Sequence, residues 1–328
     1  MPIRQQNPFV VVRGDDDLPQ QLRHGVVAIG NFDGVHRGHR AVIDTAIARA
    51  RDTGKPAVAL TFEPHPRSFF QPDEPSFRLS SEPAKLRLLA AAGLDGTVVQ
   101  TFNAALAGLT AEEFISRALV ERLAVTGVAI GFNFFFGKDR TGTPQLLAEQ
   151  GARLGFAVDI VPPFMLKGTR VSSGAVRAAL AAGRVAEATE YLGYPWFITG
   201  EIVHGDRRGR QFGYPTANLM IEPDCDLKHG IYAVRVDIDG KRHDGVASFG
   251  RRPMFDSGVV LLEVFLFDFS GDIYDKTIDV AFIAWIRHEL KFDTIEELVR
   301  RMDEDSRMAR AALARAPDIF PQLAPLAT

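Results

Sequence analysis

Two histidines stand three positions apart, directly after a short apolar run, and this spacing suits a phosphate chain. The run Val26–Ile29 is typical of a fully buried strand, which the glycine-containing stretch 30–34 then ends. His36 and His39 precede a helical pattern, so both would lie on one face of its first turn. A helix N-terminus offers unpaired N–H groups and partial positive charge to an anion. The stretch predicts a nucleotide phosphate site, although a histidine at a helix start also serves for capping alone.

Three further loops follow predicted strands. Prolines would stiffen the stretch 63–66 and present aromatics to a flat ligand, but an ordinary loop over core phenylalanines is the simpler interpretation. The stretch 131–137 holds four phenylalanines, more than one buried face requires, together with Asn133, which needs hydrogen-bond partners if it is buried. Ser172 and Ser173 begin another predicted helix, either as plain N-caps or as phosphate ligands.

A glycine-rich string in the second half of the chain suits a site for metal and phosphate. Four glycines between positions 200 and 213 break any regular element and leave room for a phosphate near the backbone. Pro215 fixes the loop so that Thr216 and Asn218 point to the same side, with oxygens suited to Mg²⁺. A surface β-loop is the alternative. Glu263 interrupts an apolar strand pattern, so its carboxylate either faces solvent or serves a site.

Short strands and amphipathic helices alternate through the first part of the chain. Strands are predicted at 26–29, 57–62, 97–101, 128–130 and 157–161, and helices at 40–51, 82–92, 111–123, 144–154 and 174–182. Such alternation predicts an α/β domain with a doubly wound parallel sheet covered on both faces. Ligands of these sheets bind at the carboxyl ends of the strands, and the candidate site loops described above follow predicted strands.

The pattern changes to β-rich segments after residue 195. These are predicted at 197–204, 231–238, 244–249, 259–269 and 278–285, and the dipeptide Asp239–Gly240 indicates a hairpin turn. They predict a small antiparallel β-barrel, followed by a terminal helix at 295–315. We place the domain boundary near residues 184–195 and assign residues 1–186 to the first domain and 187–328 to the second.

Composition excludes several classes of protein. The net charge is −3 and the acidic and basic residues are interspersed, so no nucleic-acid partner is indicated. Cys225 is the only cysteine, which excludes an internal disulfide and a cysteine-based metal site. The start resembles no signal peptide and no run is long enough for a membrane helix. We expect a cytoplasmic protein without a membrane partner, forming at most a weak or transient homo-oligomer.

The string Gly30-x-Phe32-Asp33-Gly34-x-His36-x-Gly38-His39 resembles the HxGH signature of nucleotidylyltransferases, in the form carried by prokaryotic FAD synthetases. The loop 131–137 is similar to that family's Gly-x-(Asp/Asn)-Phe-x-Phe-Gly stretch, and residues 170–177 are similar to its SST-x-IR motif, with Gly174 in place of a hydroxyl residue. The resemblance implies catalytic roles for His36, His39 and Asn133. It implies nucleotide or phosphate contacts for Gly30, Asp33, Gly34, Gly38, Arg170, Ser172, Ser173 and Arg177, and flavin contacts for Phe62, Phe70 and Phe136.

The string from Gly205 to Asn218 resembles riboflavin kinase, whose hallmark is a Gly-Arg-x-x-Gly-(Phe/Tyr)-Pro-Thr-Ala-Asn loop. The resemblance implies that Thr216 and Asn218 bind the metal, and that Glu263 is the base that takes a proton from the ribityl 5′-hydroxyl. It also implies nucleotide contacts for Gly205, Gly209, Arg210, Gly213 and Pro215, and flavin contacts for Arg287 and Asp293. Met254 and Asp275 replace a usual threonine and a usual glycine.

Together the two resemblances imply a bifunctional enzyme. It would phosphorylate riboflavin to FMN and adenylylate FMN to FAD, using ATP twice with Mg²⁺ and releasing pyrophosphate in the second step. Three alternatives stay open: only one module is active, the chain is a non-catalytic flavin-binding regulator, or the first domain adenylylates some other phosphorylated alcohol.

Overall fold

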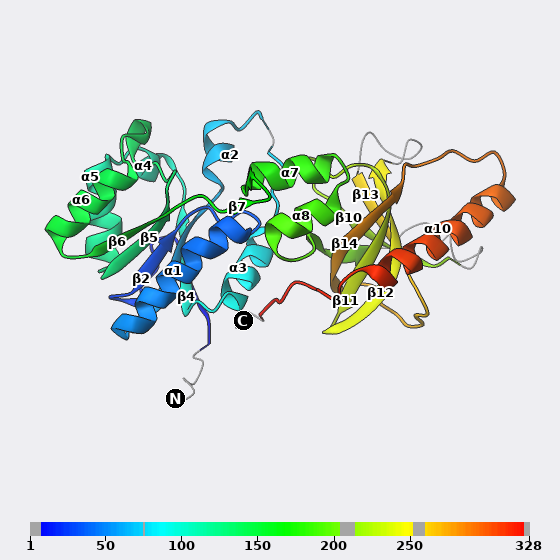
Figure 1. Cartoon of the computed structure of the whole chain (residues 1–328), viewed down its shortest axis with the longest axis horizontal. Coiled ribbons are helices and arrows are strands. Elements are labelled where there is room, and N and C mark those ends of the chain that lie inside the picture. The colour runs from blue at the N-terminus through cyan, green and yellow to red at the C-terminus, as the bar shows by residue number, and fades with distance from the viewer. Residues whose placement is uncertain (1–7, 75, 204–213, 252–259, 325–328) are drawn as a thin grey trace. The chain divides into compact units, whose positions relative to one another are not determined.

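The computed structural model describes residues 8–74, 76–203, 214–251 and 260–324 of the chain (Figure 1). It divides into two compact units. We call Met1–Ser76, Ser80–Ser172 and Gln322–Thr328 the sheet unit, and Phe77–Leu79 with Ser173–Pro321 the barrel unit. The division at residues 172 and 173 lies before the predicted domain boundary, because the helices Ser173–Ala181 and Val185–Leu192 both group with the barrel unit. No helix in the described ranges is long and apolar enough to cross a membrane.

The sheet unit is built on six parallel strands in the order β1-β4-β3-β2-β5-β6. The strands are β1 (Val10–Arg13), β2 (Val26–Ile29), β3 (Ala57–Glu63), β4 (Gly96–Thr101), β5 (Gly127–Gly131) and β6 (Ala157–Val161). All residues of β2 are buried, as expected of a central strand covered on both faces. The predicted parallel α/β sheet is confirmed, and β1 is one strand more than the sequence predicted.

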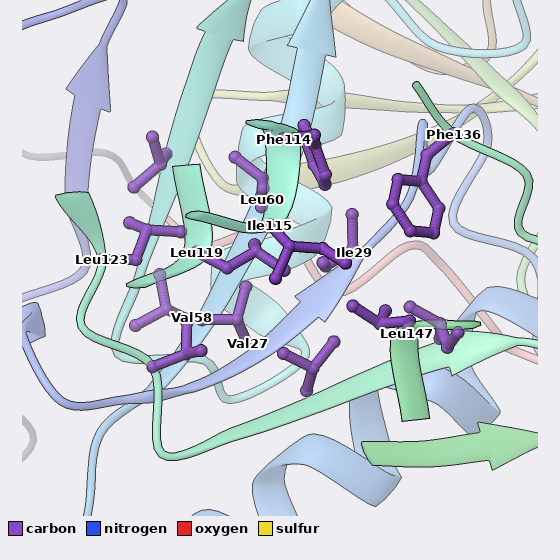
Figure 2. Packing of buried hydrophobic residues seen from close by; sticks show 14 of the residues in the cluster. Val27, Ile29, Val58, Leu60, Phe114, Ile115, Leu119, Leu123, Phe136 and Leu147 are labelled. Carbon is purple, nitrogen blue, oxygen red and sulfur yellow. The ribbon is translucent and has the colours of Figure 1, made fainter. Parts of the chain in front are cut away.

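The core of the sheet unit lies on one face of these strands. Figure 2 shows Val27 and Ile29 of β2 beside Val58 and Leu60 of β3, against a layer formed by Phe114 and its neighbours. Alternate residues along a strand face one side, so this spacing by two places one apolar row toward the layer. The covering residues come from η2 (Phe114–Arg122), which is wound as a π-helix, and from α6 (Pro144–Leu154).

Capping residues define the ends of several helices in this unit. Helix α1 (Arg37–Thr53) ends at Gly54, whose φ of 66° is the left-handed conformation that glycine adopts without strain. Ser81 caps α3 (Glu82–Ala91), and Thr110 with Glu113 forms a capping box at α5 (Ala111–Glu113). The remaining elements of this unit are η1 (Gln20–Leu22), α2 (Pro66–Phe70), α4 (Ala104–Ala107), η3 (Lys138–Arg140), β7 (Met165–Leu166) and β8 (Thr169–Arg170).

The barrel unit contains a closed barrel of six antiparallel strands in the order β10-β13-β12-β11-β14-β9. The strands are β9 (Phe197–Val203), β10 (Thr216–Met220), β11 (Gly230–Ile238), β12 (Lys241–Arg251), β13 (Val260–Leu266) and β14 (Thr277–Arg287). The hairpin predicted at Asp239–Gly240 joins β11 to β12, with φ of 52° and 79° at these residues. The predicted barrel is confirmed.

Helix α10 (Ile295–Arg315) packs on the outer face of the barrel, against β11, β12 and β14 (Figure 1). Ala309 and Leu313 of the helix meet Ala233 of β11 in a small apolar cluster. Arg235 of β11 donates to the carbonyl oxygens of Leu313, at 3.0 Å, and of Pro317. A cation at these carbonyls satisfies acceptors that a helix end leaves open, so Arg235 fixes the end of α10 on the barrel.

Two helices and a short segment from earlier in the chain complete the barrel unit. Helix α7 (Ser173–Ala181) packs on α8 (Val185–Leu192), and α8 packs on β14. The segment Phe77–Leu79 belongs to this unit: the indole N–H of Trp196 donates to the carbonyl of Leu79 at 2.8 Å, and the Phe77 ring meets the indole edge to face. Trp196 also stacks on Phe282 of β14, so the segment is joined to the barrel by direct contacts.

Candidate active sites

In the sheet unit, the candidate site lies where the strand order reverses. From β2 the chain continues to β3 and β4 on one side of the sheet and later to β5 and β6 on the other. The loops that follow β2 and β5 therefore leave neighbouring strand ends in opposite directions, and open α/β sheets bind ligands at such a switch point. The stretches 30–36 and 131–137, both singled out in the sequence, are these two loops.

The two histidines are stacked at the start of α1. Their ring centroids lie 3.7 Å apart with an interplanar angle of 13°, and Phe32 meets His39 edge to face. Nδ1 of His36 accepts the backbone N–H of His39 at 3.2 Å, so this nitrogen carries no proton and Nε2 holds it instead. A Cβ at Gly38 would lie 3.0 Å from the His36 ring, so any larger residue there would crowd this imidazole.

The protonation of His39 is set by its surroundings. Burial, followed by the charges of His36 and Lys85, holds the pKa of His39 well below its ordinary value. The imidazole is therefore neutral at pH 7. Its Nδ1 is buried and has no hydrogen-bond partner among the described residues. A neutral His39, stacked on His36 at a helix N-terminus, can donate an N–H group to a phosphate.

The loop between β2 and α1 is held in an uncommon backbone conformation. Phe32 and Val35 have φ of 50° and 35°, a region that residues with a Cβ rarely occupy. Asp33 accepts the backbone N–H of Ser80 at 3.2 Å, and the N–H of Gly34 donates to the Ser80 hydroxyl at 3.0 Å. Asp33 is buried and fixes the loop through these bonds, and its phosphate contact remains a prediction.

The aromatic residues predicted to face the flavin differ in exposure. Phe70 is 65% exposed, whereas Phe62 and Phe136 are each 7% exposed. Phe136 stacks on Phe134 and belongs to the core cluster of the sheet unit, so packing accounts for its position and its flavin contact remains a prediction. Asn133 is exposed, and its catalytic role remains a prediction. As an exposed residue at the end of β5, it needs no internal partner.

The stretch 170–177 spans the division between the two units. Arg170 is exposed in the sheet unit, with its guanidinium 5.9 Å from the centroid of the Phe132 ring. Ser172 is the last residue before the division, and Ser173 begins α7 in the barrel unit. Arg177 of α7 donates to the backbone carbonyl of Phe77 at 2.5 Å. The phosphate contacts of these four residues remain predictions.

In the barrel unit, a cavity of about 270 Å³ opens on the outer face of the barrel beneath α10. Ligand pockets in proteins hold roughly 300–1,000 Å³, so this cavity is slightly smaller than that range. It is lined by Tyr214, Thr216, Ile231, Val246, Ala247, Ser248, Glu263, Phe265, Arg287, Glu289, Leu290, Phe292, Leu298, Met302 and Asp305. Three of the predicted site residues, Thr216, Glu263 and Arg287, thus line one cavity.

Strand register brings the predicted base beside the predicted metal ligands. Glu263 of β13 lies directly opposite Asn218 of β10 and Ser248 of β12, so the three side chains share the outer face of the barrel. Leu262 and Val264 on either side of Glu263 are fully buried and face the barrel interior. Thr216 is two residues from Asn218, on the same face of β10. Alternation along β13 puts Glu263 on the face away from the barrel interior, as the sequence suggested. There it lines a cavity instead of facing open solvent.

The donor set near Glu263 fits Mg²⁺. Asn218 is 6% exposed, and its side-chain oxygen is buried without a hydrogen-bond partner among the described residues. The Thr216 hydroxyl and the Glu263 carboxylate are further oxygen donors on that face. No group of three or more His, Cys, Asp or Glu residues in the described ranges could hold a metal. A cation here would therefore take ligands from substrate phosphates as well, as Mg²⁺ commonly does.

Arg287 lines the cavity and forms an ion pair with Asp305 of α10. Its guanidinium donates to both carboxylate oxygens of Asp305, with Nε 2.7 Å from Oδ1, and both side chains are largely buried. Glu289 lines the same cavity, and burial raises its pKa, an effect that His229 and Arg287 oppose and Glu263 reinforces. Asp293 is exposed and precedes the N-cap of α10, outside the cavity lining.

The cavity contains residues that sequence reasoning missed. Ser248, Tyr214 and Asp305 face it, and only the pairing of β12 with β13 identifies Ser248 as a neighbour of Glu263. Gly205, Gly209, Arg210, Gly213 and Met254 lie outside the described residues. Pro215 is exposed and directly precedes β10. Asp275 has φ of 61°, a left-handed conformation that aspartate tolerates better than most residues with a Cβ.

Known proteins match both units. The FAD synthetase family matches residues 18–175 and the riboflavin kinase family matches residues 192–313. The bifunctional riboflavin kinase/FMN adenylyltransferase of Pseudomonas fluorescens is 41% identical over 308 residues, which cover 93% of this chain and 98% of that protein. Its counterpart in Escherichia coli K12 is 39% identical over 302 residues, which cover 92% and 96%.

A solved structure agrees over the same length. The chain from Streptococcus pneumoniae described as a macrolide-efflux protein has a TM-score of 0.82 and 31% identity, and the match covers 92% of this chain and 99% of that one. Sequence identity of this level over nearly the full length of both proteins, with the two family matches in order, leaves one conclusion. This chain belongs to the family of bifunctional riboflavin kinase/FMN adenylyltransferases.

Proposed function

We propose that this chain makes FMN from riboflavin and FAD from FMN, with ATP as the second substrate of both reactions. The kinase reaction belongs to the barrel unit and the adenylyl transfer to residues of the sheet unit. One observation carries the kinase assignment: Glu263, Asn218 and Thr216 share one face of the barrel, with Glu263 and Thr216 lining a single cavity. A pure binding site for flavin needs neither a base nor an oxygen donor set for a cation.

In the kinase reaction, the 5′-hydroxyl oxygen of riboflavin attacks the γ-phosphorus of ATP, and ADP leaves. Glu263 takes the proton of that hydroxyl, a role that general bases fulfil when they lie within hydrogen-bond reach. Thr216 and Asn218 would hold Mg²⁺, which neutralises charge on the phosphate oxygens. Arg287, fixed by Asp305, also lines the cavity and orients the flavin.

In the adenylyl transfer, a phosphate oxygen of FMN attacks the α-phosphorus of ATP, and pyrophosphate leaves. No side-chain nucleophile is required, because positioning and charge stabilisation carry such reactions. The N–H groups of His36 and His39 donate to oxygens on which charge develops. Asn133 and Arg170, at the neighbouring strand end and on β8, add polar contacts for the nucleotide. We retain as proposals the phosphate contacts of Ser172, Ser173 and Arg177 and the flavin contacts of Phe62, Phe70, Phe136 and Asp293.

A time course tests the proposal directly. Purified protein is incubated with riboflavin, ATP and Mg²⁺, and FMN and FAD are separated by chromatography. FMN that appears first and FAD that follows would support both activities. FMN without FAD would limit the chain to the kinase, and bound flavin without product would favour a binding protein. Because both reactions consume ATP, we place the enzyme in the cytoplasm, as at most a weak or transient homo-oligomer.

A further inference from the structure

Lys85 is a buried lysine for which the two reactions above have no role. It lies on α3, and 2% of its side chain is exposed. Transfer of an ammonium group into a protein interior is strongly unfavourable unless partners replace the lost water. Lysine is accordingly one of the residues least often found fully buried. Its position on α3 therefore requires a local reason.

The contacts of Lys85 join the ends of two central strands. Its Nζ donates to the Glu63 carboxylate at 2.6 Å, to the Thr61 hydroxyl at 3.3 Å and to the backbone carbonyl of Asn31 at 3.4 Å. Thr61 and Glu63 end β3, and Asn31 begins the loop that follows β2. The Thr61 hydroxyl donates to the same Asn31 carbonyl at 3.2 Å. Lys85 thus holds the start of the loop that carries His36 and His39.

Stability alone is a poor explanation for this ion pair. Replacing a buried salt bridge by apolar side chains of similar volume is often neutral or even stabilising, because the desolvation penalty disappears. A fixed positive charge beside a phosphate site can instead contribute to the reaction. It acts over several ångströms in a medium of low dielectric constant, on developing charge and on neighbouring imidazoles alike.

We propose that Lys85 is a positioning residue for adenylyl transfer, which fixes the Asn31 carbonyl and places a positive charge near the two imidazoles. The proposal rests on the function proposed above for His36 and His39. Lys85 touches the loop and not the substrate, so its effect passes through the histidines. Glu63 balances its charge locally and keeps the ammonium in place.

The charges around His39 define what Lys85 contributes. His36 stacks on His39 from the same helix, Lys85 acts from α3, Asp33 lies in the preceding loop and is bonded to Ser80, and Glu63 of β3 is bonded to Lys85. Burial, His36 and Lys85 lower the pKa of His39, in that order. Loss of the Lys85 charge therefore shifts the titration of His39 to higher pH, toward the ordinary histidine range near about 6.5.

The test compares Lys85→Met with the double variant Lys85→Met/Glu63→Gln, which removes both charges and leaves neither buried alone. Arg51→Met is the matched control, because it removes a cation from the far end of α1, about 18 Å along the helix from His39. Three quantities are measured on the full chain: FAD formation from supplied FMN, FMN formation from riboflavin, and the NMR titration of labelled histidine side chains, with the His39 signal assigned from His39→Gln.

Both lysine variants should lose about tenfold or more of FAD formation, since small misplacement of catalytic groups has effects of this size or larger. Their His39 titration should move to higher pH, while FMN formation and the Arg51→Met control stay unchanged. The double variant should regain thermal stability lost in the single variant but not the rate. Unchanged FAD formation, or an unmoved His39 titration, would overturn the inference. Wild-type protein that makes no FAD would overturn the proposed function instead.

Discussion

The substitution Glu263→Gln tests the chemical role of Glu263 while the fold of the barrel unit is kept. The substitution exchanges one carboxylate oxygen for an amide nitrogen and keeps the size and shape of the side chain. Glu263 lies on the outer face of β13, so the apolar residues that fill the barrel interior are untouched. A substitution of this kind away from the core usually changes the free energy of unfolding by about 0.5 kcal/mol or less.

The expected loss of activity follows from the role of a general base. The amide of glutamine cannot take the proton of the riboflavin hydroxyl, and a positioned base contributes roughly 10²–10⁴-fold to rate. At about 1.36 kcal/mol per tenfold change, this corresponds to about 3–5 kcal/mol of transition-state stabilisation. We expect kcat for FMN formation to fall by that factor, with a smaller change in KM for riboflavin.

The assay follows both reactions on the same preparation. Initial rates of FMN formation from riboflavin and of FAD formation from supplied FMN are measured by chromatography, and thermal unfolding shows whether the barrel is intact. FAD formation should stay close to the wild-type rate, because Glu263 and the histidines belong to different units. FMN formation within about threefold of wild type would refute the assignment of Glu263 as the base, since a base contributes more than this.

Three further outcomes are expected. His36→Ala should lower FAD formation from FMN by about 10²-fold while FMN formation persists; unchanged FAD production would remove this residue from the site. Asn218→Leu should raise the Mg²⁺ concentration needed for half-maximal FMN formation, since it removes a buried oxygen; an unaltered Mg²⁺ dependence would contradict the ligand assignment. Burial raises the pKa of Glu289, so it destabilises the folded state by an amount that is absent below the ordinary glutamate pKa and reaches its full size once the pH exceeds the raised value of the folded state. Glu289→Gln should therefore raise the urea midpoint at pH 8 and not at pH 4, and equal shifts at both would contradict this cause.

The sequence predicts those parts of the fold that are determined by a few neighbouring residues. The apolar run of β2, the glycine break and the histidines at the start of α1 appear in the structure as predicted. The same holds for the Asp239–Gly240 hairpin, since only residues tolerant of positive φ fit such a turn. These features are determined by a few neighbouring residues, so one sequence is sufficient to identify them.

Features that depend on distant partners were not predictable in the same way. The sequence predicts a loop where β10 lies, because prolines and glycines precede it. This strand forms by pairing with β9 and β13, and the residues of β13 are distant in the sequence. Helix α8 occupies the stretch taken as the domain boundary. Lys85 reads as an ordinary helical lysine, and only the ends of β2 and β3 show that it is buried. The exposure of Asn133 likewise depends on how its loop leaves the sheet.

The segment Phe77–Leu79 makes it difficult to divide the chain into two fragments that each carry one activity. It joins the barrel unit through the Trp196 indole and the Arg177 guanidinium, yet it lies within the stretch of chain that otherwise builds the sheet unit. A single cut near residue 173 would leave both donors without their carbonyl acceptors, and a cut near residue 187 would leave Trp196 without its acceptor; either cut would remove the contact between Phe77 and Trp196. Gene fission at the apparent boundary would thus yield a kinase fragment with an exposed aromatic surface, and the shared segment favours keeping both reactions on one polypeptide.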